Sequence, residues 1–150
     1  MPAATTEAHR RDPLWRKIMP LVRISLLEGR PPAELRAIAD GVHRALVEAY
    51  GVPPDDRFQI IEQRRPDEII FDPGYLGIAR TDRLVIIHVV ASSWRDTAAK
   101  QALYRALADN LASNPGLRRE DVQVVISPND RPDWSFGNGV AAYVPADGNG

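Results

Sequence analysis

The chemically most unusual residue of this chain is a proline that directly follows an internal methionine, at Met19-Pro20. If translation starts at Met19 and that methionine is removed, Pro20 carries a free secondary amine. An α-amino group titrates at about 7.7–8.0, so this amine could act as an acid, a base or a nucleophile near neutral pH. If translation starts at Met1, the Pro20 nitrogen is an amide and this chemistry is absent.

A second group of candidate residues falls in loops at the ends of predicted strands. Its members are Asp56, Arg80, Arg95, Trp134 and Phe136. Folds that alternate strands and helices place their sites in such loops. Taken singly, each member also has a structural explanation as a turn residue, a solvated charge or a core aromatic. His88 lies within an apolar strand, where we expect a structural histidine with a satisfied ring.

Composition excludes several other classes of chemistry. The chain has 150 residues, 44% hydrophobic and 26% charged, which suits one globular domain. A formal net charge of −1 suggests neither nucleic acid nor a membrane surface as partner. The absence of cysteine excludes disulfides, thiolate catalysis and cysteine-bound zinc. No histidine pair at metal spacing, glycine-rich phosphate loop or G-x-S-x-G motif occurs, so we expect no metal and no organic cofactor.

Two further absences concern location. No apolar run approaches the roughly 20 residues that a membrane-spanning helix needs. The first eighteen residues lack the apolar centre of a secretory signal. We therefore expect a cytoplasmic protein.

Hydrophobic periodicity predicts a β-α-β unit that occurs twice. The first unit has strands at residues 20–27 and 57–62, with a helix at about 32–50 between them. The second has strands at 83–90 and 121–126, with a helix that Asp96 or Thr97 caps and that runs to about residue 113. The matching helix positions Arg44-Ala45-Leu46 and Arg105-Ala106-Leu107 support an internal repeat.

Two such units predict an α+β (α/β) fold in which a four-stranded sheet carries both helices on one face. The run from Leu84 to Val90 is almost continuously apolar, as in strands that are buried on both faces. We therefore expect other copies of the chain to cover the second face. Residues 1–19 are expected to be an amino-terminal extension that is disordered or not translated, 20–142 the domain, and 143–150 a flexible tail.

These features together resemble the tautomerase superfamily, and within it the group around malonate semialdehyde decarboxylase. The features are the strand-initial Pro20, the doubled β-α-β unit, the G-V-P-x-x-D-R motif at residues 51–57 and the W-S-F-G-x-G motif at residues 134–139. The resemblance runs from Pro20 to about Ala142. It implies an amino-terminal catalytic proline, a homotrimer, a small carboxylate substrate and no cofactor.

The resemblance also implies roles for single residues. Pro20 matches the catalytic proline. Asp56 matches the family aspartate, which assists the proline by positioning water or a proton or by holding the amine cationic. Arg95 matches the second of two arginines that bind the substrate carboxylate, a task that suits the forked guanidinium.

The remaining pocket positions include a departure from the decarboxylase pattern. Trp134 and Phe136 match aromatics that wall the pocket and exclude water. Ser93 stands where the decarboxylase has its first arginine, in a loop that is one residue longer. A single arginine resembles the broader tautomerase branch.

Three functions stay open at this point. A neutral Pro20 amine would catalyse keto–enol tautomerisation of small 2-oxo acids. A cationic amine would favour decarboxylation of a 3-oxo acid or hydration of an unsaturated acid. If Pro20 is acylated, the chain is a non-catalytic trimer that binds small carboxylates or serves as a scaffold.

Overall fold

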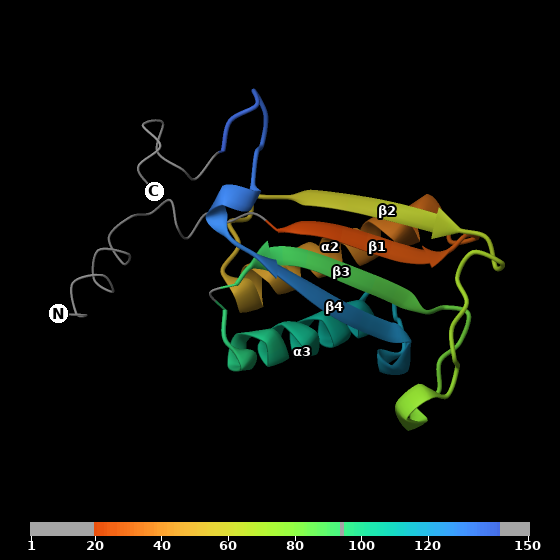
Figure 1. Ribbon diagram of the computed structural model, residues 1–150. Coiled ribbons are helices and arrows are strands. Elements are labelled where there is room, and N and C mark those ends of the chain that lie inside the picture. The colour runs from red at the N-terminus through yellow and green to blue at the C-terminus, as the bar shows by residue number, and fades with distance from the viewer. Residues whose placement is uncertain (1–19, 94, 142–150) are drawn as a thin grey trace.

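The computed structural model describes residues 20–93 and 95–141. The predicted extension at residues 1–19, the tail at 143–150 and Trp94 lie outside the described residues. The main elements are, in order, β1 (Leu21–Leu27), α2 (Pro32–Tyr50), β2 (Phe58–Arg64), β3 (Val85–Ser92), α3 (Thr97–Ser113) and β4 (Val122–Asn129). Both helices lie on the same face of the sheet (Figure 1).

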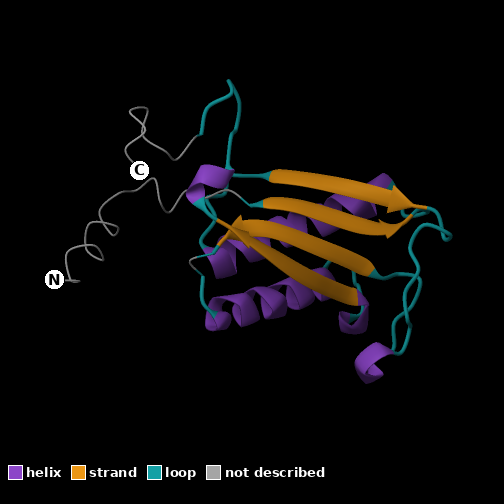
Figure 2. Cartoon of the chain, in the orientation of Figure 1, coloured by secondary structure: helices purple, strands orange, loops and turns teal. Residues whose placement is uncertain are grey.

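The four strands form one sheet in the order β2-β1-β3-β4 (Figure 2). Within each β-α-β unit the two strands are parallel, and the units join through antiparallel β1 and β3. This confirms the predicted doubled unit. Because the join is antiparallel, the starts of β1 and β2 lie at the same end of the sheet as the ends of β3 and β4. We call this end the site end.

Local signals explain where the helices begin and end. Pro32 occupies the first turn of α2, where a missing backbone N–H costs nothing. Gly51 ends α2 in the left-handed conformation, with φ of 67°, which glycine adopts without strain. Asp96 caps α3 by accepting a hydrogen bond from the Ala99 backbone N–H, so Asp96 and not Thr97 is the cap.

The core lies between the sheet and the two helices. Alternate residues of β1 and β3 point into it, and the stripes of α2 and α3 pack against them. The main fully buried members are Val22, Ile24, Leu26, Ile38, Val42, Leu46, Val85, Ile87, Val89, Leu103, Leu107 and Leu111. Burial of this apolar surface is the main force that holds helices and sheet together.

The opposite face of the sheet, which we call the open face, is covered by neither helix. It presents the alternate residues of β1 and β3, with side chains of the edge strands beside them. Ile60 on β2 is 39% exposed and Val125 on β4 is 49% exposed. His88 lies in the middle of this face, and its Nε2 is 2.7 Å from the Ser127 hydroxyl, as predicted for a satisfied structural histidine.

Strand bounds differ from prediction at the strand ends. The third strand was predicted at residues 83–90, and β3 spans Val85–Ser92 instead. It is extended because its pairing with β4 continues to Ser92 opposite Asn129, beyond the apolar run. The second and fourth strands are likewise longer than their apolar segments, since backbone pairing with a neighbour does not require an apolar side chain.

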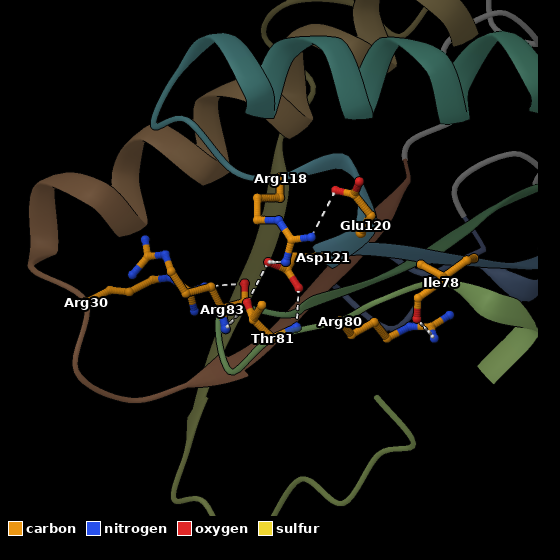
Figure 3. A network of polar contacts seen from close by, with 8 residues as sticks. All are labelled: Arg30, Ile78, Arg80, Thr81, Arg83, Arg118, Glu120 and Asp121. Carbon is orange, nitrogen blue, oxygen red and sulfur yellow. Dashed lines mark hydrogen bonds and ion pairs between the residues drawn. The ribbon is translucent and has the colours of Figure 1, made fainter. Parts of the chain in front are cut away.

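The long connection from β2 to β3 is fastened at its far end by a polar network (Figure 3). Asp121, which is 1% exposed, accepts hydrogen bonds of 2.7 Å from both the backbone N–H and the hydroxyl of Thr81. Beside it, Arg30 donates to the Arg83 carbonyl, and Arg83 pairs with Glu34. The connection is thus tied to the start of β4 and to the start of α2.

Replacing this buried carboxylate should destabilise the fold. Asp121→Ala removes two charge-assisted hydrogen bonds, and we expect the free energy of unfolding to fall by about 2–3 kcal/mol. Thr81→Val keeps the backbone N–H donor and should lose about half as much. Urea unfolding at one fixed protein concentration measures both, and equal stability of Asp121→Ala and wild type would contradict this assignment.

Candidate active site

Pro20 lies at the site end, directly before β1, and is buried. The first residue of β1, Leu21, pairs with Phe58, the first residue of parallel β2. Pro20 therefore lies beside the segment Asp56-Arg57, which leads into β2. The structure thus brings together two of the residues singled out from the sequence.

Asp56 is a buried carboxylate, 4% exposed. Neither of its carboxylate oxygens accepts a hydrogen bond from any residue that the structure describes. Burial, and after it the charge of Asp55, raises the pKa of Asp56 to about 6, although His43 and Arg95 act in the opposite direction. A carboxyl that titrates near 6 can exchange protons close to neutral pH.

Arg95 is also buried, 4% exposed, in the loop between β3 and α3. Its Nη2 donates a hydrogen bond of 3.1 Å to the Tyr50 carbonyl, and its guanidinium carbon lies 4.2 Å from the centre of the Tyr50 ring. Burial lowers the pKa of Arg95 to about 10, while Tyr50 and Asp56 act to raise it. Arg95 therefore remains a cation at neutral pH, within electrostatic range of the Asp56 carboxyl.

An aromatic cluster stands at the same end. Trp134 and Phe136 stack with ring centres 5.3 Å apart and planes 6° apart. Phe58 joins them, with its ring centre 6.1 Å from that of Phe136. Trp134 Nε1 donates a hydrogen bond of 3.0 Å to the Asn129 side chain, which fixes the indole at the end of β4.

Phe58 did not stand out in the sequence, where it reads as an ordinary strand residue. Its position directly after Asp56-Arg57 was the available signal, because Phe58 begins β2 and pairs with Leu21, the residue that directly follows Pro20. The aromatic cluster is therefore built from both β-α-β units.

Ser93 lies at the site end but supplies no charge there. Its backbone N–H donates to the Asn129 carbonyl at 2.9 Å, and its hydroxyl donates to Asp130 at 2.7 Å. The serine is exposed and tied to the segment that leads to Trp134.

One candidate, Arg80, lies away from this end of the sheet, and His43, which was not a candidate, contacts the turn before Asp56. Arg80, grouped with the site candidates, lies in the connection at the other end of the sheet. Its Nη1 donates to the Tyr75 carbonyl and to the Ile78 carbonyl (Figure 3). His43 lies in α2 with its Nε2 2.8 Å from the Pro54 carbonyl. Periodicity could not show this contact, because Pro54 lies beyond the end of the helix.

Comparison with known proteins decides the family. A model of the tautomerase enzyme family matches residues 56–137, and a second model with the same description matches residues 20–79. The probable tautomerase YusQ of Bacillus subtilis (strain 168) is 41% identical over 126 residues, which cover 84% of this chain and 99% of that protein. This chain belongs to the tautomerase family.

Solved structures support the same assignment. A malonate semialdehyde decarboxylase with decarboxylase and hydratase activities is 35% identical with a TM-score of 0.77, covering 82% of this chain and 95% of its own. The FG41 malonate semialdehyde decarboxylase, inhibited by 3-bromopropiolate, is 42% identical with a TM-score of 0.77, covering 82% and 93%. A fused 4-OT, described as a symmetric trimer, shares the fold at 24% identity and a TM-score of 0.67, covering 81% and 95%.

Among the described residues of this tautomerase, two features are absent. None of its helices within residues 20–93 and 95–141 is long and apolar enough to cross a membrane. In the same ranges, no three histidine, aspartate or glutamate side chains come together as a metal site would require.

The raised pKa of Asp56 makes a prediction about stability. Between the ordinary value of 3.8 and the folded value of about 6, the folded state binds more protons at Asp56 than the unfolded state does. Stability due to this group is therefore fully present below the unfolded pKa and is lost as pH rises through the folded pKa. We expect Asp56→Asn to gain about 2–3 kcal/mol relative to wild type between about pH 3.5 and pH 7.

Denaturant unfolding across this pH range measures the difference. Asp82→Asn is the matched control, because Asp82 is exposed and lies before β3, at the opposite end of the sheet. A pH-independent difference between Asp56→Asn and wild type would contradict the raised pKa.

Proposed function

We propose that this tautomerase-family enzyme uses Pro20 as an amino-terminal base on small 2-oxo acids and catalyses keto–enol tautomerisation. The observation that carries the proposal is the juxtaposition, at one buried end of the sheet, of Pro20 with a carboxyl of pKa about 6 and a buried arginine. No metal or organic cofactor is needed for this reaction.

In the proposed reaction the neutral Pro20 nitrogen removes a proton from C3 of the 2-oxo acid. The electron pair of that C–H bond becomes the C2=C3 double bond, and the carbonyl oxygen takes up a proton to give the enol. Arg95 holds the substrate carboxylate and offsets the charge that develops on the enolate oxygen. Asp56 positions water or a proton beside the amine.

A free amine at Pro20 requires that translation begin at Met19 and that this methionine be removed. Two findings support this start. One family model begins its match at Pro20. The 126 matched residues account for 99% of YusQ but only 84% of this chain, so this chain carries residues without a counterpart in that relative.

Decarboxylation of a 3-oxo acid is a second candidate, supported by the 35% and 42% identity to malonate semialdehyde decarboxylases. Here a cationic Pro20 would polarise the 3-oxo group, and the electron pair of the bond to CO2 would pass to the carbon left behind. The exposed, Asp130-bound hydroxyl of Ser93 argues against this reaction, because only Arg95 would then hold the departing carboxylate. Release of acetaldehyde from malonate semialdehyde distinguishes the two candidates.

The state of the Pro20 nitrogen decides between an enzyme and a binding protein. We expect protein that begins at Pro20 to tautomerise phenylpyruvate. Pro20→Ala should lower kcat/KM by about 10²-fold or more, because general base catalysis contributes about 10²–10⁴-fold. Ultraviolet absorbance of the enol gives the rates.

The full 150-residue chain serves as the matched control, since it keeps the proline ring but acylates its nitrogen. It should be as slow as Pro20→Ala. Equal rates for all three proteins would reject the role of Pro20, and an intact mass that includes residues 1–18 in protein made from the native gene would reject the start at Met19.

We also propose a homotrimer in which other copies cover the open face. This face carries the exposed apolar side chains of Phe58, Ile60 and Val125 beside strands that a single chain buries on one side only. Exposed apolar patches on a sheet mark association surfaces. The resemblance described above supports three copies in particular.

A charge on the open face should therefore dissociate the assembly. Val125→Glu replaces a half-exposed residue, so the single chain tolerates it, but burial of the carboxylate between copies would be costly. Light scattering coupled to gel filtration should give a trimer for wild type and a monomer for Val125→Glu. Gln101→Glu, on the exposed side of α3, is the control, and an unchanged mass for Val125→Glu would contradict this interface.

A further inference from the structure

Two side chains of α2, Asp40 and His43, lie one helical turn apart and contact the segment that carries Asp56. His43 reaches the residue two positions before Asp56, and Asp40 reaches the residue directly after it. Neither stood out in the sequence as part of a site. Both contacts are directed at the backbone or side chains that flank the buried carboxylate.

The His43 contact fixes one side of Asp56. His43 Nε2 lies 2.8 Å from the Pro54 carbonyl oxygen, and a carbonyl can only accept, so Nε2 carries the hydrogen. The backbone N–H of Asp56 in turn donates to the Pro53 carbonyl at 3.0 Å, which closes a turn around Asp55. The turn is thereby fastened to the helix at its centre.

The Asp40 contact fixes the other side. Arg57 Nη2 donates to Asp40 Oδ1 at 2.7 Å, and Arg57 Nε donates to the Gln59 side chain at 2.8 Å. Gln59 then donates to the Ala39 carbonyl of α2 at 2.8 Å. Asp56 is therefore held between two attachments to the same helix.

We propose that His43 and Asp40 are positioning residues that keep the Asp56 carboxyl buried beside Pro20. This inference rests on the proposed function and adds to it the residues that prepare its acid–base group. A carboxylate without hydrogen bonds gains by turning outward to water, so the turn must be restrained for Asp56 to stay inside. The two attachments supply that restraint.

The charged and titratable groups that face Asp56 allow a sharp test. They are Asp55 from the turn, His43 from α2 and Arg95 from the loop before α3. The charge of His43 lowers the pKa of Asp56. If His43 acted only through this charge, replacing it with an uncharged residue would raise that pKa. As a restraint, its removal would let water reach Asp56 and lower the pKa. The two roles thus predict opposite signs.

The experiment is a carbon-13 NMR titration of the Asp56 carboxyl in the full chain. We expect His43→Leu to lower the pKa of Asp56 by about one unit or more, toward its ordinary value of 3.8. His43→Gln keeps an N–H donor and should restore most of the wild-type value. Arg44→Leu, at an exposed neighbouring position of α2, is the matched control and should change nothing.

An unchanged or higher pKa in His43→Leu would overturn the proposal. If that variant does not fold, Gln59→Leu loosens the turn from its other side without changing a charge, and it must lower the Asp56 pKa for the proposal to stand. Because the titration needs no substrate, it separates this inference from the proposed function. A lowered pKa in protein that lacks tautomerase activity would sustain the positioning role and reject the reaction.

Discussion

Antiparallel pairing between β1 and β3 is the constraint on which the site depends. Each β-α-β unit alone would bring together only the starts of its two strands at one end and their finishes at the other. Antiparallel pairing of β1 with β3 places the starts of the first unit's strands at the same end of the sheet as the ends of the second unit's strands. Pro20 and Asp56 come from the first unit and Trp134 from the second, so Trp134 shares their end of the sheet only because of this join.

The site end also concentrates polar groups that are costly to bury. Asp56 and Arg95 are each 4% exposed. Burial raises the pKa of Asp56 and lowers that of Arg95, so it favours the uncharged form of both groups. Their mutual attraction offsets only part of this cost, because it is a secondary cause of both shifts. A chain selected for stability alone would place apolar residues here, so the arrangement is better explained by chemistry at this end.

Much of this arrangement could be predicted from the sequence. The doubled unit followed from hydrophobic period, and the bounds of α2 followed from Pro32 and Gly51, because these signals are local. The assignment of Asp56 and Arg95 to one site relied on the family resemblance, because no local sequence signal connects residues that are 39 positions apart. Arg80 was misplaced because its loop looks the same in composition, although it follows β2 and so lies at the opposite end of the sheet.

The contacts of His43 and Phe58 did not follow from hydrophobic periodicity, for a common reason. Each side chain contacts a segment outside its own helix or strand. The hydrophobic periodicity of that helix or strand predicts which face the residue occupies, but not what the residue contacts. Phe58 belongs both to the aromatic cluster and to the open face, where it is 49% exposed beside Leu21. A second copy packed on that face would remove water from Phe58 and, through it, from Phe136. Assembly and exclusion of water from the aromatic cluster would then depend on the same side chain, because β2 begins at the site end and is also an edge strand of the open face.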